Sequence, residues 1–166
     1  SGQLTLAQIQ ADRQPWQRQV KEIPHFGYST SAFWLRVNLH NPQAQAMSRL
    51  LEVGYPLLDD VQVYLTDAQG RLLLHQTLGD QLPFHARPID HHLFVLPLHF
   101  DAGQITTLYI RVASSSGVQV PLALWEPWAF QSHDNLRLIA LGFFYGSLLI
   151  MAAYNLFLWV SIRDRS

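Results

Sequence analysis

The chain of 166 residues contains no cysteine, which excludes disulfide bonds and thiolate chemistry without deciding the compartment. Its 11 basic and 12 acidic side chains leave no positive excess of the kind that binds nucleic acid. It has no glycine-rich phosphate-binding loop and no serine in a nucleophile-elbow motif. A glycosidase needs two facing carboxylates, for which Asp59 or Asp80 would have to find a partner. We therefore expect no enzyme activity in this segment.

One long stretch carries no charge at all, from Leu138 to Val160. As a helix it would extend about 35 Å, enough to cross a hydrocarbon core about 30 Å thick. A buried helix of a soluble protein is usually shorter and keeps a polar stripe. Trp159 lies where an interfacial aromatic residue would sit. The stretch 138–160 is thus predicted to be a transmembrane helix.

The flanks of this stretch predict its orientation. Arg163 and Arg165 follow it closely, whereas the preceding Arg137 is offset by Asp134. The positive-inside tendency then places the C-terminal end in the cytoplasm, so that residues 161–166 begin a cytoplasmic loop. The preceding residues would lie outside, which in a bacterium means the periplasm. No export signal is recognisable at Ser1, and we expect one to have been removed.

The N-terminal part of the chain has the pattern of a β-rich domain. Thr5 and Gln8 have the spacing of a capping box that opens a short helix. From Phe33 to His40 apolar and polar residues alternate, which is typical of a strand with one buried face. Similar short runs follow at 49–55, 61–66, 71–76, 92–100, 106–113 and 118–125. Residues 1–126 are therefore predicted to form an all-β sandwich of jelly-roll type.

The segment 127–137 connects this domain to the predicted span. Pro127 suits the start of a helix. Trp128, Phe130 and Leu136 could rest on the membrane interface or pack on the sandwich, and the sequence leaves both open.

Several runs of the chain together resemble a known family. They include FGYSTSAFWLRVNLHNP, LLEVGYPLLDDVQVYL, TLGDQLPFHARPIDHHLFVLPL, TLYIRVASS and PLALWEPWAF. Their order and spacing are similar to the second type of extracellular sensory domain of bacterial receptors with seven transmembrane helices and diverse intracellular signalling modules. The run LGFFYGSLLIMAAYNLFLWVSIRDRS resembles the first of those helices. The resemblance implies a jelly roll like those of carbohydrate-binding modules, a periplasmic position on the inner membrane, and a cytoplasmic kinase or diguanylate cyclase downstream.

The polar face of the predicted strand 33–40 is the first candidate ligand site. It carries Trp34, Arg36 and His40, with Tyr109 and Arg111 expected on a neighbouring strand. Aromatic faces stack on sugar rings, and arginine donates in a planar, bidentate way to carboxylates or hydroxyls. Alternatively, Trp34 covers a sheet face and Arg36 pairs with a local acid.

The loop 79–92 is the second candidate because it is rich in titratable side chains. Arg87 would anchor a ligand carboxylate, or pair with Asp80 or Asp90. His92 is also predicted to bind the ligand. His91 and His92 would point to opposite faces of a strand, which argues against a shared metal ion.

Asp59 and Asp60 are the third candidate, as two adjacent carboxylates in a turn. Calcium takes oxygen ligands from such turns. Ordinary turn capping is the alternative.

Together these features predict a periplasmic sensor that binds a small polar ligand, with a saccharide as first choice, and signals through the membrane. A calcium-sensing or protein-interaction ectodomain is the alternative. No cofactor other than calcium is expected, no nucleic-acid partner is expected, and a homodimer is left open.

Overall fold

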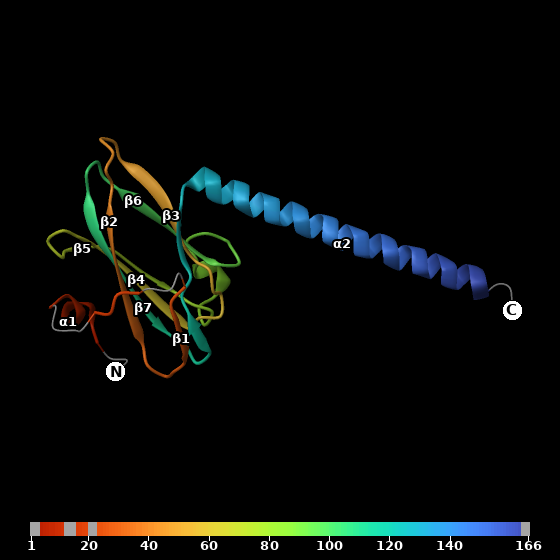
Figure 1. The fold of residues 1–166 in the computed structure, drawn as a ribbon, viewed down its shortest axis with the longest axis horizontal. Helices are drawn as coiled ribbons and strands as arrows, with labels where there is room; N and C mark the ends of the chain where they lie inside the picture. Colours follow the sequence, from red (N-terminus) through yellow and green to blue (C-terminus); the bar gives the residue numbers. More distant parts are fainter. Residues whose placement is uncertain (1–3, 12–15, 20–22, 164–166) are drawn as a thin grey trace. The chain divides into compact units, whose positions relative to one another are not determined.

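The computed structural model describes residues 4–11, 16–19 and 23–163, and the chain divides into two compact units at Glu126 and Pro127. The first unit holds the β-strands and the second holds a long helix (Figure 1). The prediction of an all-β domain followed by one C-terminal apolar helix is confirmed. The jelly-roll connectivity and the likeness to carbohydrate-binding modules stay predictions.

The described strands form three antiparallel sheets. Four strands make the largest sheet, in the order β2-β7-β4-β5, three make a second sheet, in the order β6-β3-β9, and β1 pairs with β8. Their bounds are β1 His25–Tyr28, β2 Phe33–His40, β3 Met47–Val53, β4 Asp60–Asp67, β5 Leu72–Leu78, β6 Phe94–Phe100, β7 Ile105–Ala113, β8 Gly117–Gln119 and β9 Leu122–Trp125.

A single hydrophobic core joins the two larger sheets. The four-stranded sheet contributes one face of alternating apolar residues, and the three-stranded sheet contributes another, as in a β-sandwich. The largest fully buried side chains include Phe94, Phe100, Leu98 and Ile110. The apolar residues predicted for one face of β2 pack against this core as partly buried side chains, namely Phe33, Leu35, Val37 and Leu39. The period-two pattern therefore identified the buried face of β2 correctly.

The predicted single strand 118–125 is wrong, because the chain there forms two strands in different sheets. β8 pairs with β1, whereas β9 pairs with β3. Between them the N–H of Val120 donates to the carbonyl of Pro24 (3.0 Å), and the carbonyl of Pro121 accepts from Gly54 (2.9 Å). Pro121 has no N–H to continue a ladder, so the change of partner falls where a strand is easily interrupted. β1 was not predicted.

The short N-terminal helix α1, Leu6–Gln10, confirms the capping-box prediction. The N–H of Thr5 donates to Oε1 of Gln8 (2.9 Å), as the reciprocal capping arrangement requires. Gln10 donates to the carbonyl of Gly70 (3.0 Å) in the turn between β4 and β5. Ile9 is buried, so α1 is attached to the β domain by packing and by a hydrogen bond.

The second unit is one continuous helix, α2, which runs from Pro127 to Arg163 over 37 residues. It includes the predicted connecting segment, the predicted span and the first residues after the span; residues 164–166 lie outside the described part. Two polar side chains within it bond to its own backbone, Ser147 to the carbonyl of Phe144 and Asn155 to the carbonyl of Met151. Among the described residues, α2 is the one helix long and apolar enough to cross a membrane.

Candidate functional site

The outer face of the four-stranded sheet brings four of the predicted ligand-binding residues together. The register of β2 with β7 places Trp34 opposite Arg111, and Arg36 opposite Tyr109. Their side chains share the face that points away from the core, because they alternate with the core residues of both strands. His40 lies at the far end of the same face of β2, opposite Ile105.

A row of stacked rings crosses this outer face. Trp34 of β2 stacks on Tyr64 of β4, with ring centroids 5.7 Å apart and planes inclined by 22°. Tyr64 stacks in turn on His75 of β5, at 4.4 Å and 3°. The facing surfaces of these rings are occupied by one another. A sugar ring could therefore stack on Trp34 only on the side away from Tyr64.

A polar network begins at Tyr64 of this row and includes Arg111. The Tyr64 hydroxyl donates to Oε1 of Gln62, Gln62 donates to Asp60, and Arg111 pairs with Asp60. Burial raises the pKa of Tyr64; the positive charge of Arg111 works against this rise, and the negative charge of Asp60 adds to it. Arg111 is thus ion-paired with Asp60 within the sheet. This pair supports a role for Arg111 in holding the neighbouring polar side chains of the outer face in place.

A groove lies along β2 beside residues 16–19. Its volume is about 830 Å³, within the range of about 300–1,000 Å³ that is usual for small-molecule sites. Its lining comprises Trp16, Gln17, Arg18, Gln19, Pro24, Phe26, Phe33, Trp34, Leu35, Arg36, Val37, Asn38 and Leu122. Two of the seven predicted ligand-binding residues, Trp34 and Arg36, are in this lining.

Trp16 covers part of the outer face. The Arg36 guanidinium lies over its ring at 4.6 Å, and its ring centroid is 6.4 Å from that of Tyr109. This contact helps to explain why Tyr109 is only 7% exposed although it lies on the outer face. The indole nitrogens of Trp16 and Trp34 are both buried, and in the described part of the chain neither has a hydrogen-bond partner. Trp16 was missed from the sequence, because no periodic pattern marks the segment around it.

Arg87 belongs to a different place, the loop that precedes β6. Its guanidinium donates to the carbonyls of His91 (2.7 Å) and His92 (3.3 Å). It also lies between two rings, 4.9 Å from Phe84 and 4.9 Å from Phe94. Neither Arg87 nor His92 lines the groove along β2. Through these contacts Arg87 stabilises the loop that precedes β6.

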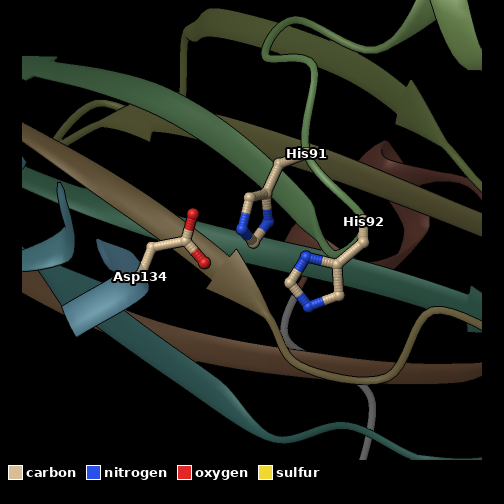
Figure 2. A group of neighbouring side chains, drawn as sticks. All are labelled: His91, His92 and Asp134. Atoms are coloured by element: carbon tan, nitrogen blue, oxygen red, sulfur yellow. The ribbon is translucent and has the colours of Figure 1, made fainter. Parts of the chain in front are cut away.

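His91 and His92 lie side by side, contrary to the expectation that they point to opposite faces of a strand. β6 begins only at Phe94, so neither residue is part of it. Figure 2 shows the two rings next to each other, and their centroids are 4.1 Å apart. The N–H of Leu93 donates to Nδ1 of His91 (3.2 Å). Asp134, also labelled in Figure 2, belongs to helix α2 of the second unit.

The two aspartates proposed for calcium are engaged by different partners. Oδ2 of Asp59 accepts the backbone N–H of Ser115 (2.7 Å), whereas Asp60 binds Arg111 and Gln62. The Ser115 N–H holds the pKa of Asp59 below its usual value of 3.8. A calcium ion would have to share these carboxylates with the Ser115 N–H, the Gln62 amide and the Arg111 guanidinium. The calcium site stays a prediction.

The lowered pKa of Asp59 predicts a specific change in acid stability. The folded state binds this proton less tightly than the unfolded state, so the carboxylate contributes stability above about pH 4. That contribution is lost as the pH falls through the lowered folded-state pKa. Asp59→Asn should therefore lower the melting temperature at pH 6 to 7 and flatten its decline between pH 5 and 2.5. Thermal unfolding across this pH range measures the effect.

The exposed Asp80 provides the control, because Asp80→Asn also removes one carboxylate, and the Asp80 N–H bonds to the carbonyl of Leu58 (2.9 Å), next to Asp59. Equal flattening of the acid profile in both variants would contradict a specific role for the Asp59–Ser115 bond.

Comparison with known proteins identifies the β domain. The family described as 7TMR-DISM extracellular 2 matches residues 1–126, which end where the first compact unit ends. No curated protein matches the chain. The matched domain is followed directly by α2, the helix that is apolar and long enough to span a membrane. The chain therefore belongs to the 7TMR-DISM extracellular 2 family of receptor sensory domains and carries its domain outside a membrane.

Proposed function

We propose that residues 1–126 form a periplasmic ligand-sensing domain that binds a saccharide in the groove along β2. The domain acts by binding and not by catalysis. Occupancy of the groove is relayed through α2 to a kinase or diguanylate cyclase module on the cytoplasmic side of a bacterial inner membrane. The family match supports the sensory role, and the groove supports the choice of ligand.

The observation that carries this proposal is the position of Trp34 and Arg36 in one groove. Trp34 has one ring face against Tyr64, so its other face is the one left for a ligand ring. Arg36 lies two residues along the same strand and on the same face. Aromatic stacking combined with donors to hydroxyl oxygens is the usual way in which proteins hold sugars.

Trp34→Ala should weaken saccharide binding at least tenfold, which corresponds to a lost contact of about 1.4 kcal/mol. Binding is measured by thermal shift and calorimetry on the full chain in detergent, against a panel of neutral and acidic monosaccharides. A bound sugar raises the melting temperature by mass action. His40→Ala is the control, because His40 is on the same face of β2 but outside the groove lining. A folded Trp34→Ala variant that binds every ligand as tightly as wild type would refute the site.

The orientation of the span is tested separately. A reporter active only in the cytoplasm should work when fused after Ser166, because Arg163 and Arg165 follow the apolar stretch. The same reporter fused before Leu138 should be silent. Activity of the second fusion alone would place the β domain in the cytoplasm and end the proposal of a periplasmic sensor.

One observation favours a second candidate, a protein-interaction role. In the described sheets β2 pairs only with β7, so its other edge is left unpaired beside the groove. An extended peptide could add to that edge as a further strand. Trp34→Ala would weaken sugar binding but not strand addition, which depends on the β2 backbone.

A further inference from the structure

The groove along β2 is rich in side chains that only donate hydrogen bonds. Trp16, Arg18, Trp34 and Arg36 all line it. Indole and guanidinium groups have N–H donors and no acceptor. Gln17, Gln19 and Asn38 complete the polar lining and can both donate and accept. A ligand that fits this lining must therefore bring more acceptors than donors.

Two of these donors lack an acceptor among the residues that the structure describes. Nε1 of Trp16 and Nε1 of Trp34 are buried and make no hydrogen bond. Burying an N–H without a partner costs free energy, so such groups are rare in folded proteins. Trp125 shows the usual arrangement, because its indole N–H donates to the carboxylate of Glu52 (2.7 Å). Among the described residues Arg87 Nε and Thr106 Oγ1 are also buried without a partner, so what distinguishes Trp16 and Trp34 is that both line the groove.

We propose that the ligand of this groove is a sugar acid of the hexuronate type, and that Trp16 and Trp34 determine this specificity. The inference rests on the proposed saccharide-sensing function and narrows it to one chemical class. A neutral sugar hydroxyl that accepts a hydrogen bond also brings a hydrogen that needs an acceptor. A carboxylate brings acceptors only, and its bonds to N–H donors are charge-assisted.

The geometry assigns each group a part. The pyranose ring stacks on the face of Trp34 that is turned away from Tyr64. The carboxylate accepts from the indole N–H groups of Trp16 and Trp34, and the exposed Arg18 supplies positive charge at the groove. Both indole nitrogens are covered in this structure. A ligand can therefore bond to them only if the side chains that cover them shift on binding.

The test compares D-galacturonate with D-galactose, which differ by a carboxylate in place of a hydroxymethyl group. Calorimetry on the full chain in detergent should show galacturonate binding at least about tenfold more tightly than galactose. Trp16→Phe and Trp34→Phe keep an aromatic ring and lose the N–H. Each should weaken galacturonate about tenfold while changing galactose less than about twofold. Trp125→Phe, which removes an indole N–H outside the groove, should change neither.

A second readout follows the two N–H groups directly. In ¹⁵N-labelled protein, galacturonate should move the indole signals of Trp16 and Trp34, assigned from the phenylalanine variants, and leave that of Trp125 in place. Unchanged thermal unfolding of both variants without ligand shows that any loss of binding is not a loss of fold.

The outcomes separate this inference from the proposed function. If galactose binds as tightly as galacturonate, or the phenylalanine variants bind galacturonate normally, the sugar-acid inference is overturned and the saccharide site stands. If neither sugar nor any other saccharide of the panel binds, the sugar-acid inference and the proposed saccharide-sensing function are both refuted.

Discussion

Replacing Gly79 by alanine should prevent the β domain from folding stably. Gly79 is buried and has φ +153°, a conformation that side-chain-bearing residues rarely adopt. A Cβ at this position would lie 2.1 Å from the carbonyl oxygen of Asp59. That oxygen is backbone, so only a shift of the chain relieves the clash. The adjacent N–H of Asp80, which donates to the carbonyl of Leu58 (2.9 Å), would move as well.

We expect Gly79→Ala to lower the free energy of unfolding by about 4 kcal/mol or more. Losses of this size are exceptional for a single substitution. Gly103→Ala is the matched control, because Gly103 also has a positive φ (+64°) but no atom within 4 Å of the added Cβ. It should lower the free energy of unfolding only by the strain of a left-handed backbone conformation, about 1–2 kcal/mol. Urea unfolding followed by far-ultraviolet circular dichroism measures both. Equal losses in the two variants would show that close approach to Asp59 is not the cause.

Phe94→Ala should produce the second large loss of stability. Phe94 is fully buried in the core between the two larger sheets, and it also lies against the Arg87 guanidinium at 4.9 Å. Removing a buried phenylalanine leaves a cavity and costs about 3–5 kcal/mol. A domain whose total stability is about 5–15 kcal/mol would lose a large part of it. The same urea titration gives the value.

Phe84 allows the core contribution to be separated from the contact with Arg87. It lies at the same distance from the guanidinium, but it is 53% exposed. Phe84→Ala should therefore cost about 1 kcal/mol or less, the usual value of an exposed cation–π contact. If Phe84→Ala lowered the free energy of unfolding as much as Phe94→Ala, the contacts around Arg87, and not the core, would hold β6 in place.

The parts of the fold that follow from local patterns could be predicted from the sequence. Alternation along 33–40 identified the buried face of β2 and, by exclusion, the outer face with Trp34 and Arg36. The capping residues of α1 and the apolar helix were also predicted correctly. These features depend on neighbours in the sequence, which any pattern analysis sees.

The features that depend on pairing between distant segments could not be predicted in this way. The row Trp34–Tyr64–His75 exists only because β2, β7, β4 and β5 lie in that order. Trp16 reaches the groove from a segment without periodicity. Arg87 binds backbone carbonyls, which leave no trace in residue type. The break at Pro121 was overlooked because the alternation continues across it.

Because α2 is one unbroken helix, its length can affect the signalling output of a receptor of this kind. A helix of 37 residues extends about 55 Å, more than the thickness of a hydrocarbon core. Each residue added to it turns everything beyond by about 100° and advances it by about 1.5 Å. Under the proposed function, the number of residues between Pro127 and Arg163 therefore sets the angular phase between the sensory and cytoplasmic ends. Insertions and deletions in α2 should alter output periodically, with a period of one helical turn.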